Sequence, residues 1–493
     1  MIQLLFLILP LFLSASVPEM TLDEKIGQLF MAPACPLRGN DHWADWQKLM
    51  KECHVGNAIV KESDPISQVK FLNRLQVESK VPLLVAADAE WGLAMRMSNT
   101  IAFPRNMTLG AIQALNLIRQ MGQIIGQQAK LVGIQMNLAP VADINNNPAN
   151  PVIHMRSFGE NPHRVAACVS AFSQGLQSSG ILACAKHFPG HGDTNVDSHR
   201  GLPVINHPLE RLEVIEFVPF KQLIEEGISA LMTAHLYVPA LDPVYPTSLS
   251  SLCMKGIARD ELHFEGLIIS DALNMKAIVD RYSPEEIALL ARKAGCDLLL
   301  YGDHIAPNVD EIIREMIPRA FQALKKAYLS GELDVKDLDA SVSRILAAKQ
   351  NINPSLPLGD LLASLHMPNA LDLKKQLFQE AITLIGEPAF PLQEEVIYWN
   401  VKDPFPTTPY DQIVIEVDSK EVLTEKILSQ IESLADRSIL CLYASPYLLK
   451  HFKGQKTILI AYENDPDAKL AVQNILVGKE EAKGHLPITI DGL

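Results

Sequence analysis

The chain is 493 residues long, with 48% apolar and 20% charged residues, which is near the average of packed soluble proteins and excludes a disordered or fibrous protein. This length exceeds a single small fold and predicts either about three domains or one large barrel with a companion domain. The net charge is −14, with 57 acidic against 43 basic residues. No run of lysine and arginine stands out, so nucleic acid is not an expected partner.

The first residues differ from the rest of the chain. Ile2 to Leu13 are almost all apolar and are followed by the small residues Ser14, Ala15 and Ser16, a pattern typical of a signal peptide over residues 1–16. The segment is too short to cross a bilayer comfortably, and no stable membrane span is expected. We expect an exported protein, periplasmic or extracellular, if this segment is cleaved, and a cytoplasmic one otherwise.

Short apolar runs alternate with amphipathic stretches over residues 17–352, as in repeated strand–helix units. Eight such runs begin at Leu29, Asn57, Pro82, Met136, Ile181, Ser229, Leu267 and Asp297. Their mean spacing, about 38 residues, accommodates one strand and one helix per unit and predicts a (β/α)8 barrel. An open, doubly wound sheet is the structural alternative.

Helical stripes lie between the runs. Apolar residues recur at helical spacing at Leu115, Ile118, Gly122 and Ile125, and in the expected closing helix at Leu338, Val342, Ile345 and Leu346. The seven cysteines include no C-x-x-C pair, which favours buried thiols, Cys184 among them, over a disulfide scaffold or a thiolate zinc site.

The composition changes after the predicted barrel. Residues 353–410 are rich in proline and predict a connector containing one helix. Strand-like runs return near Ile413 (IVIEV) and continue in SILCLY and TILIAY, with helical patterns over 420–434 and 467–477. We therefore expect a smaller α/β sandwich domain over residues 411–493.

Ionisable residues end five of the eight predicted strands. They are Asp88, Asp143, Lys186 with His187, His235 and Asp271. The carboxyl ends of the strands of a parallel barrel meet on one face, where active sites lie. Unpaired charges in a core are costly, so we expect these side chains to share one pocket.

The segment from Lys186 to His199 reads KHFPGHGDTNVDSH and holds three histidines and two aspartates. One interpretation is a metal site of His187, His191 and His199 with Asp193 or Asp197, although no pair of ligands sits one turn apart on a helix. The other is acid–base chemistry, because Asp197 is two residues from His199 and could orient its ring. The same pair could also simply fix the loop.

Asp271 ends its strand with no lysine or arginine in the next four residues. A carboxylate held there suits attack on an electrophilic carbon, as in retaining glycoside hydrolysis. The structural alternative is an N-cap for a helix starting at Ala272.

Several segments resemble, in order, those of the bacterial family 3 glycoside hydrolases that act as β-N-acetylglucosaminidases, the NagZ type. The most specific is KHFPGHGDTNVDSHRGLP (Lys186 to Pro203). The others are LAPVADINNNPANPVIHMRSFGENP (Leu138 to Pro162), MTAHLYVPALD (Met232 to Asp242), PTSLS (Pro246 to Ser250) and GLIISDALNM (Gly266 to Met275). The resemblance covers about residues 20–350, and a weaker one, to the α/β sandwich of two-domain members, covers Tyr462 to Ile490.

This resemblance implies a retaining, exo-acting β-N-acetylglucosaminidase that acts on peptidoglycan-derived fragments without a metal or cofactor. Asp271 would be the nucleophile and His199 the acid/base, oriented by Asp197. The implied sugar-binding residues are Asp88, Arg96, Arg156, Lys186 and His187, of which Arg96 and Arg156 come from the resemblance alone.

Two departures from the family pattern bear on specificity. Glu90 is followed by Trp91 and Gly92 where members commonly have two glycines, so Trp91 could stack on a sugar or narrow the pocket. Ala272 follows Asp271 where many members have a second aspartate. The alternatives are a family 3 β-glucosidase or xylosidase, which would draw its acid from the second domain, a non-catalytic cell-wall glycan-binding protein, and a metallohydrolase.

Overall fold

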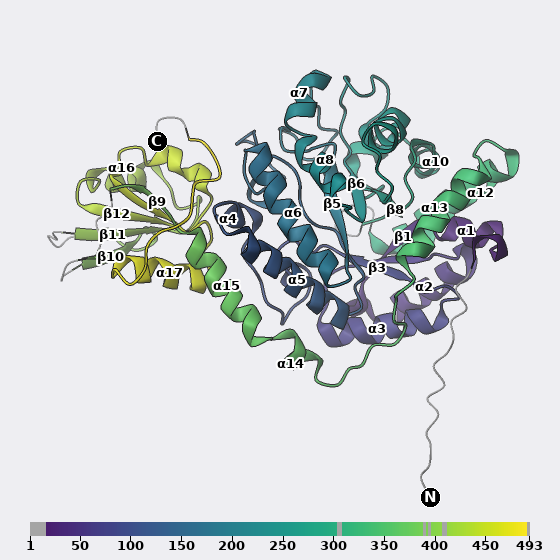
Figure 1. The fold of residues 1–493 in the computed structure, drawn as a ribbon, viewed down its shortest axis with the longest axis horizontal. Coiled ribbons are helices and arrows are strands. Elements are labelled where there is room, and N and C mark those ends of the chain that lie inside the picture. The colour runs from purple at the N-terminus through teal and green to yellow at the C-terminus, as the bar shows by residue number, and fades with distance from the viewer. Residues whose placement is uncertain (1–15, 303–307, 388–390, 393–395, 407–411, 491–493) are drawn as a thin grey trace, which may run out of the picture.

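The computed structural model describes residues 16–302, 308–387, 391–392, 396–406 and 412–490. The predicted signal segment therefore lies outside the described residues except for Ser16. Two bodies follow each other along the chain, a large barrel and a smaller sheet domain (Figure 1). In the described part of the chain, no helix combines the length and the apolar character needed to cross a bilayer.

The barrel is built from eight parallel strands that follow the chain in order from β1 to β7, with β8 beside β1. A parallel bridge between Ile269 and Leu298 joins β7 to β8 and closes the ring, which excludes the open doubly wound sheet. All eight predicted apolar runs form strands. They are β1 (Phe30–Ala34), β2 (Asn57–Val60), β3 (Leu84–Ala87), β4 (Met136–Asn137), β5 (Leu182–Phe188), β6 (Ala230–Thr233), β7 (Leu267–Ser270) and β8 (Leu299–Leu300).

Helices surround the barrel (Figure 1). The longer ones are α2 (Gly39–Cys53), α3 (Pro65–Glu78), α5 (Leu115–Leu131), α6 (Pro162–Ser178), α8 (Val218–Glu225), the π-helix η6 (Leu252–Glu261), α10 (Pro284–Ala294), α12 (Ile317–Ser330) and α13 (Val335–Ala348). Shorter ones are η1 (Val17–Glu19), α1 (Leu22–Gly27), η2 (Pro36–Arg38), η3 (Leu93–Met95), α4 (Asn106–Gly110), η4 (His154–Arg156), α7 (Leu209–Val214), η5 (Thr247–Leu249), α9 (Lys276–Val279), α11 (Val309–Glu311) and η7 (Ile312–Met316).

The sequence explains where these helices begin and how closely they pack. Helix α3 starts after Asp64, whose carboxylate accepts from the amides of Ile66 and Ser67, a standard N-cap. Both predicted stripes form helices, α5 and α13. At Gly122 on α5 a Cβ atom would lie 2.4 Å from the carbonyl oxygen of Phe172 on α6, so the close contact of the two helices requires glycine.

The second domain contains a five-stranded sheet in the order β10-β11-β12-β13-β9, parallel except for β9. Its elements are α14 (Leu361–Leu365), α15 (Pro368–Ala381), β9 (Thr383–Gly386), β10 (Val396–Asn400), β11 (Gln412–Val417), α16 (Glu425–Ser433), β12 (Ser438–Leu442), η8 (Pro446–His451), β13 (Thr457–Ile460) and α17 (Pro466–Leu476). Helix α16 lies on one face of the sheet, and α15 and α17 lie on the other (Figure 1), which is the expected sandwich.

The stretch predicted to be a connector, 353–410, contains more structure than expected. Besides α14 and α15 it includes β9 and β10, which belong to the second sheet. The sheet therefore starts before residue 411, because an edge strand contributed by β9 pairs antiparallel with β13, about 70 residues later in the chain. All seven cysteines lie among the described residues and are buried.

Candidate active site

The carboxyl ends of the barrel strands surround a cavity of ≈270 Å³. Seven of the predicted site residues line it: Asp88, Arg96, Arg156, Lys186, His187, His199 and Asp271. The eighth, Asp197, holds His199 at the edge of the cavity. Asp88 directly follows β3, Lys186 and His187 lie at the end of β5, and Asp271 directly follows β7. The barrel itself thus brings together residues that lie far apart in the sequence.

Two of the strand-end residues lie behind this cavity instead of lining it. Asp143 is fully buried, 2.7 Å from Nδ1 of His187, and its other oxygen accepts from the amides of His187 and His191. His235 is also fully buried, between the Ser248 hydroxyl (2.6 Å) and the carbonyl oxygen of Ala272 (2.9 Å). The expectation of one shared pocket is wrong for these two residues, because their buried hydrogen bonds support its wall from behind.

A buried ion-pair network forms one wall of the cavity. Lys186 Nζ lies 2.9 Å from Asp88 Oδ1 and 2.9 Å from Glu90 Oε1. Arg96 contacts the other oxygen of Asp88 at 2.9 Å, and Arg156 donates two hydrogen bonds to Glu90 at 2.7 and 3.1 Å. Arginine forks of this kind fix a carboxylate in one orientation. The wall is therefore rigid before any ligand arrives.

These pairs keep both carboxylates ionised. Burial alone would raise the pKa of Asp88, but Lys186, Lys61 and Arg96 hold it well below its usual range. Burial likewise opposes ionisation of Glu90, yet Arg156 and Lys186 lower its pKa to about 2. Charged hydrogen-bond acceptors thus face the cavity at any physiological pH.

Asp271 directly follows β7 and lines the same cavity as the network. Burial would raise the pKa of Asp271, but His235, His187 and the amide of Ala272 lower it, so the carboxylate is ionised. Its Oδ1 accepts a hydrogen bond from the Ala272 amide at 2.7 Å. The next helix, α9, starts at Lys276, and its N-cap position is Met275. Asp271 is therefore not a helix N-cap.

The loop after β5 carries His199 to the cavity. The Asp197 carboxylate lies 2.7 Å from Nδ1 of His199 and accepts from its amide at 2.9 Å, the geometry that the one-residue spacing predicts. Burial would raise the pKa of Asp197, and the hydrogen bonds from the His199 amide and ring lower it. An ionised aspartate on Nδ1 fixes the proton there and makes Nε2 the basic nitrogen.

The alternative metal site is not assembled. His187 pairs with Asp143, the ring of His191 contacts Thr194 and Ser198, and Asp193 lies 2.7 Å from His207. Within the described ranges, no three His, Cys, Asp or Glu side chains are grouped as metal ligands. The sequence could not separate these cases, because each histidine of the loop finds a different partner once the loop folds.

Trp91 is not among the residues that line the cavity. The guanidinium of Arg105 lies 4.9 Å from its ring centroid, a cation–π contact. Of the two roles considered for Trp91, stacking on a sugar and narrowing of the pocket, neither is seen in the lining of this cavity.

Two charged lining residues were missed by sequence reasoning. Lys61 directly follows β2 and lies 3.6 Å from Asp88, and Glu90 follows β3 by three residues. The strand-end rule could have found Lys61. Glu90 had no such signal, because its role depends on Arg156 and Lys186 from distant segments.

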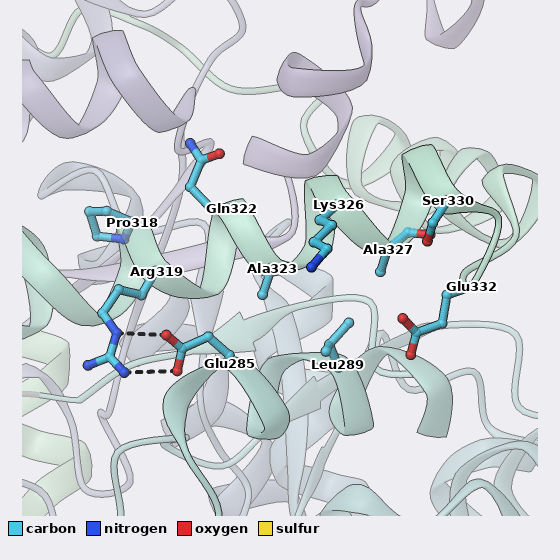
Figure 2. A pocket seen from close by; sticks show the side chains of 10 residues that line it. All are labelled: Glu285, Leu289, Pro318, Arg319, Gln322, Ala323, Lys326, Ala327, Ser330 and Glu332. Atoms are coloured by element: carbon cyan, nitrogen blue, oxygen red, sulfur yellow. Dashed lines mark hydrogen bonds and ion pairs between the residues drawn. The ribbon is translucent and has the colours of Figure 1, made fainter.

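A roomier hollow, ≈650 Å³, lies between α10 and α12 on the outside of the barrel (Figure 2). Figure 2 shows Glu285 and Arg319 across it, joined by two hydrogen bonds of 2.7 and 3.0 Å. Of the four charged side chains that line it, Glu285 and Arg319 pair with each other and Glu332 pairs with Lys293 outside it. The smaller cavity, where charged groups from several strand ends meet, is the candidate active site.

Comparison with known proteins agrees with this geometry. Residues 21–348 match the family described as glycosyl hydrolase family 3 N terminal domain. A beta-hexosaminidase A from Pseudoalteromonas piscicida is 32% identical over 65% of this chain and 56% of its own length. A beta-N-acetylglucosaminidase/beta-glucosidase from Cellulomonas fimi is 27% identical over 76% of this chain and 66% of its own length. The chain thus spans less than two thirds of both relatives.

Among solved structures, a family 3 beta-N-acetylglucosaminidase from Paenibacillus sp. is similar over both domains. Its TM-score is 0.81 at 32% identity, and the match covers 95% of this chain and 99% of that one. The arrangement of barrel and second domain is therefore shared with a protein of that family.

Proposed function

The chain belongs to glycosyl hydrolase family 3, and we propose that it is a retaining, exo-acting β-N-acetylglucosaminidase that removes terminal β-linked N-acetylglucosamine from peptidoglycan-derived fragments. The observation that carries this proposal is the meeting of Asp271 with the Asp197–His199 pair at one cavity. The two relatives with N-acetylglucosaminidase or hexosaminidase names and the Paenibacillus structure support the sugar.

The chemistry proceeds in two displacements. In the first, Asp271 attacks the anomeric carbon while His199, protonated on both ring nitrogens, gives its Nε2 proton to the glycosidic oxygen, so the leaving sugar departs with a neutral hydroxyl and a glycosyl ester of Asp271 forms. In the second, His199 takes a proton from water, which attacks the same carbon and releases Asp271. The low pKa of Asp271 keeps it ionised for the first step.

The charged wall is proposed to bind the terminal sugar. Asp88, Arg96, Arg156 and Lys186 offer charged donors and acceptors to hydroxyl and N-acetyl groups, and His187 offers a ring nitrogen. Hydrogen bonds to charged groups are stronger than neutral ones and strengthen further out of water. The cavity is near the lower end of ligand-site volumes, about 300 Å³, which suits one sugar ring and exo-action.

The local charge supports this class of fragment. The cavity wall has four lysine and arginine side chains against three carboxylates, whereas the chain as a whole carries a net charge of −14. A locally positive site in an acidic protein favours an anionic substrate, such as a muropeptide. A rate advantage of muropeptides over neutral chitobiose that falls with added salt tests this; an equal rate at low salt contradicts it.

The decisive experiment uses an aryl N-acetylglucosaminide and a fluorinated sugar inactivator. We expect hydrolysis, and mass spectrometry should place the trapped sugar on the peptide containing Asp271. Asp271→Asn should abolish both turnover and labelling, whereas a non-catalytic glycan-binding protein would give neither in the wild type.

A β-glucosidase activity is the second candidate, because the name of the Cellulomonas fimi relative combines both activities. Parallel assays with an aryl glucoside decide between them. We expect the N-acetylglucosaminide to have the larger kcat/KM; a preference for the glucoside overturns the proposed specificity.

A further inference from the structure

Among the contacts of the second domain with the barrel, two reach the segments that hold the sugar-binding wall. On one side, Tyr447 of η8 reaches the loop that precedes η4. On the other, Glu463 reaches the start of α4. Arg156 ends η4, and its carbonyl oxygen accepts from the side chain of Asn106, the first residue of α4, at 2.6 Å. Both contacts therefore converge on Arg156.

The contact through Tyr447 fixes a strained turn. The Asn145 side chain donates to the Tyr447 hydroxyl at 2.6 Å and accepts from the amide of His154 at 2.8 Å. The His154 ring packs 4.9 Å from the Tyr447 ring, and its Nε2 lies 3.4 Å from the Ser445 hydroxyl. His154 has a φ of 38°, a left-handed conformation that costs energy in a residue with a β-carbon and persists only when its surroundings hold it.

The contact through Glu463 fixes the other segment. Its Oε1 accepts from the amide of Arg105 at 2.7 Å and from the Thr108 hydroxyl at 2.6 Å. The guanidinium of Arg105 in turn covers Trp91, the neighbour of Glu90. Glu463 thus supports both partners of the Glu90–Arg156 ion pair.

We propose that Tyr447 and Glu463 are positioning residues through which the second domain sets the place of Arg156 in the sugar-binding wall. This inference rests on the proposed function for its kinetic readout. Neither residue lines the cavity, so both act on substrate binding through Arg156 and leave Asp271 and His199 unaffected.

The test compares Tyr447→Phe and Glu463→Gln with the wild type on an aryl N-acetylglucosaminide. Loss of one or two buried hydrogen bonds should raise KM about threefold to tenfold, with kcat changed by less than about twofold because the chemical step is untouched. The matched control is Tyr398→Phe, since Tyr398 is 51% exposed on edge strand β10 of the same domain. A fall in kcat with KM unchanged overturns the proposal.

A double-mutant cycle shows whether the effect passes through Arg156. Arg156→Lys keeps the charge but loses the two-pronged contact with Glu90. If Tyr447 acts through Arg156, Tyr447→Phe should change KM much less in the Arg156→Lys background than in the wild type. Equal effects in both backgrounds overturn the proposal.

A structural readout keeps the inference separate from the proposed function. In a crystal structure of Tyr447→Phe, at least one Arg156–Glu90 hydrogen bond should lengthen beyond about 3.5 Å. An unmoved pair refutes the positioning role whatever the enzyme hydrolyses. A wild type inactive on N-acetylglucosaminides refutes only the function.

Discussion

Two lysines are buried at opposite ends of the same barrel, and they are held in different ways. At the carboxyl ends of the strands, Lys186 contacts two carboxylates, and although burial works against its charge, Asp88 and Glu90 raise its pKa. At the amino ends, Lys349 follows α13 and donates to Gln28 Oε1 at 2.6 Å and to the carbonyl oxygen of Gly56 at 2.7 Å. Burial lowers the pKa of Lys349 to about 7.

The difference separates a binding face from a supporting face. The charges around Lys186 are paired yet border a cavity, so a ligand can share them. Lys349 ties α13 to the segments that precede β1 and β2 and uses only neutral oxygens to do so. This agrees with the general division of parallel barrels into an active carboxyl face and a stabilising amino face.

The largest expected effect comes from removing the acid/base. His199→Gly should lower kcat/KM by about 10²–10⁴-fold on substrates with poor leaving groups, the usual contribution of proton transfer. Activated aryl glycosides, which need no protonation, should lose far less. Rates across a series of leaving groups check this, with Lys349→Met as the control that should retain its rate per folded molecule. Equal losses on all leaving groups would contradict the role of His199.

The second largest expected effect is a difference in how much the two lysines contribute to the free energy of unfolding. Lys186→Met leaves Asp88 and Glu90 without a shared partner and should cost about 3–5 kcal/mol in the free energy of unfolding. Lys349→Met loses two hydrogen bonds to neutral oxygens but also removes a buried amine whose pKa burial lowers to about 7, so its cost at pH 7 should be smaller than that of Lys186→Met. Urea titrations at pH 7 measure both values, and a larger loss for Lys349→Met would reverse the comparison.

Lys349, at the amino ends of the strands, should make folding stability depend on pH above pH 7. In the unfolded chain Lys349 keeps its proton up to a pKa of 10.5, whereas in the folded protein it releases it near pH 7. The unfolded state therefore binds more protons in this window, and the Lys349 contribution makes stability rise with pH, by about 3 kcal/mol between pH 7 and pH 9 at most. The difference between wild type and Lys349→Met should show this slope; a parallel pH dependence of the two proteins would exclude it.

Glu90, at the carboxyl ends of the strands, should make folding stability fall at acidic pH. The folded pKa of Glu90, about 2, lies below the unfolded value of 4.5, so its contribution is present above pH 4.5 and is lost as the pH falls toward 2. It amounts to something on the order of 3 kcal/mol. Glu90→Gln should be less stable at pH 7 and should lose less on acidification than the wild type, as followed by urea unfolding from pH 5 to pH 3.

The smallest effect is expected far from both ends. Glu285 and Arg319 bridge the outer hollow between α10 and α12 at the surface (Figure 2), where ion pairs contribute little. Glu285→Gln should leave both the melting temperature and the kinetics close to those of the wild type. A clear change in turnover would show that this hollow is coupled to the active site.

Much of the barrel and its site could be predicted from the sequence, because both depend on local patterns. A short apolar run followed by a charge marks a strand end, and this rule found Asp88, Lys186, His187 and Asp271. It could not tell the cavity-lining residues from Asp143 and His235, which differ only in what packs behind them. Arg156 required the family resemblance.

The second domain was less predictable. Strand β9 pairs with β13, about 70 residues later in the chain, and the short runs of β9 and β10 among prolines carry little local signal. The barrel residues that Tyr447 and Glu463 contact lie 302 and 358 residues earlier in the chain. Such contacts have no sequence period, and only the folded arrangement brings them together.

The buried thiols can report when each of the two domains unfolds. Burial raises the pKa of the Cys184 thiol on β5 to about 12 and also raises that of Cys441 on β12, so neither sulfur reacts with an alkylating reagent while its sheet is closed. Because one cysteine lies inside the barrel and the other inside the second sheet, pulsed alkylation read peptide by peptide would time the unfolding of each without any engineered label.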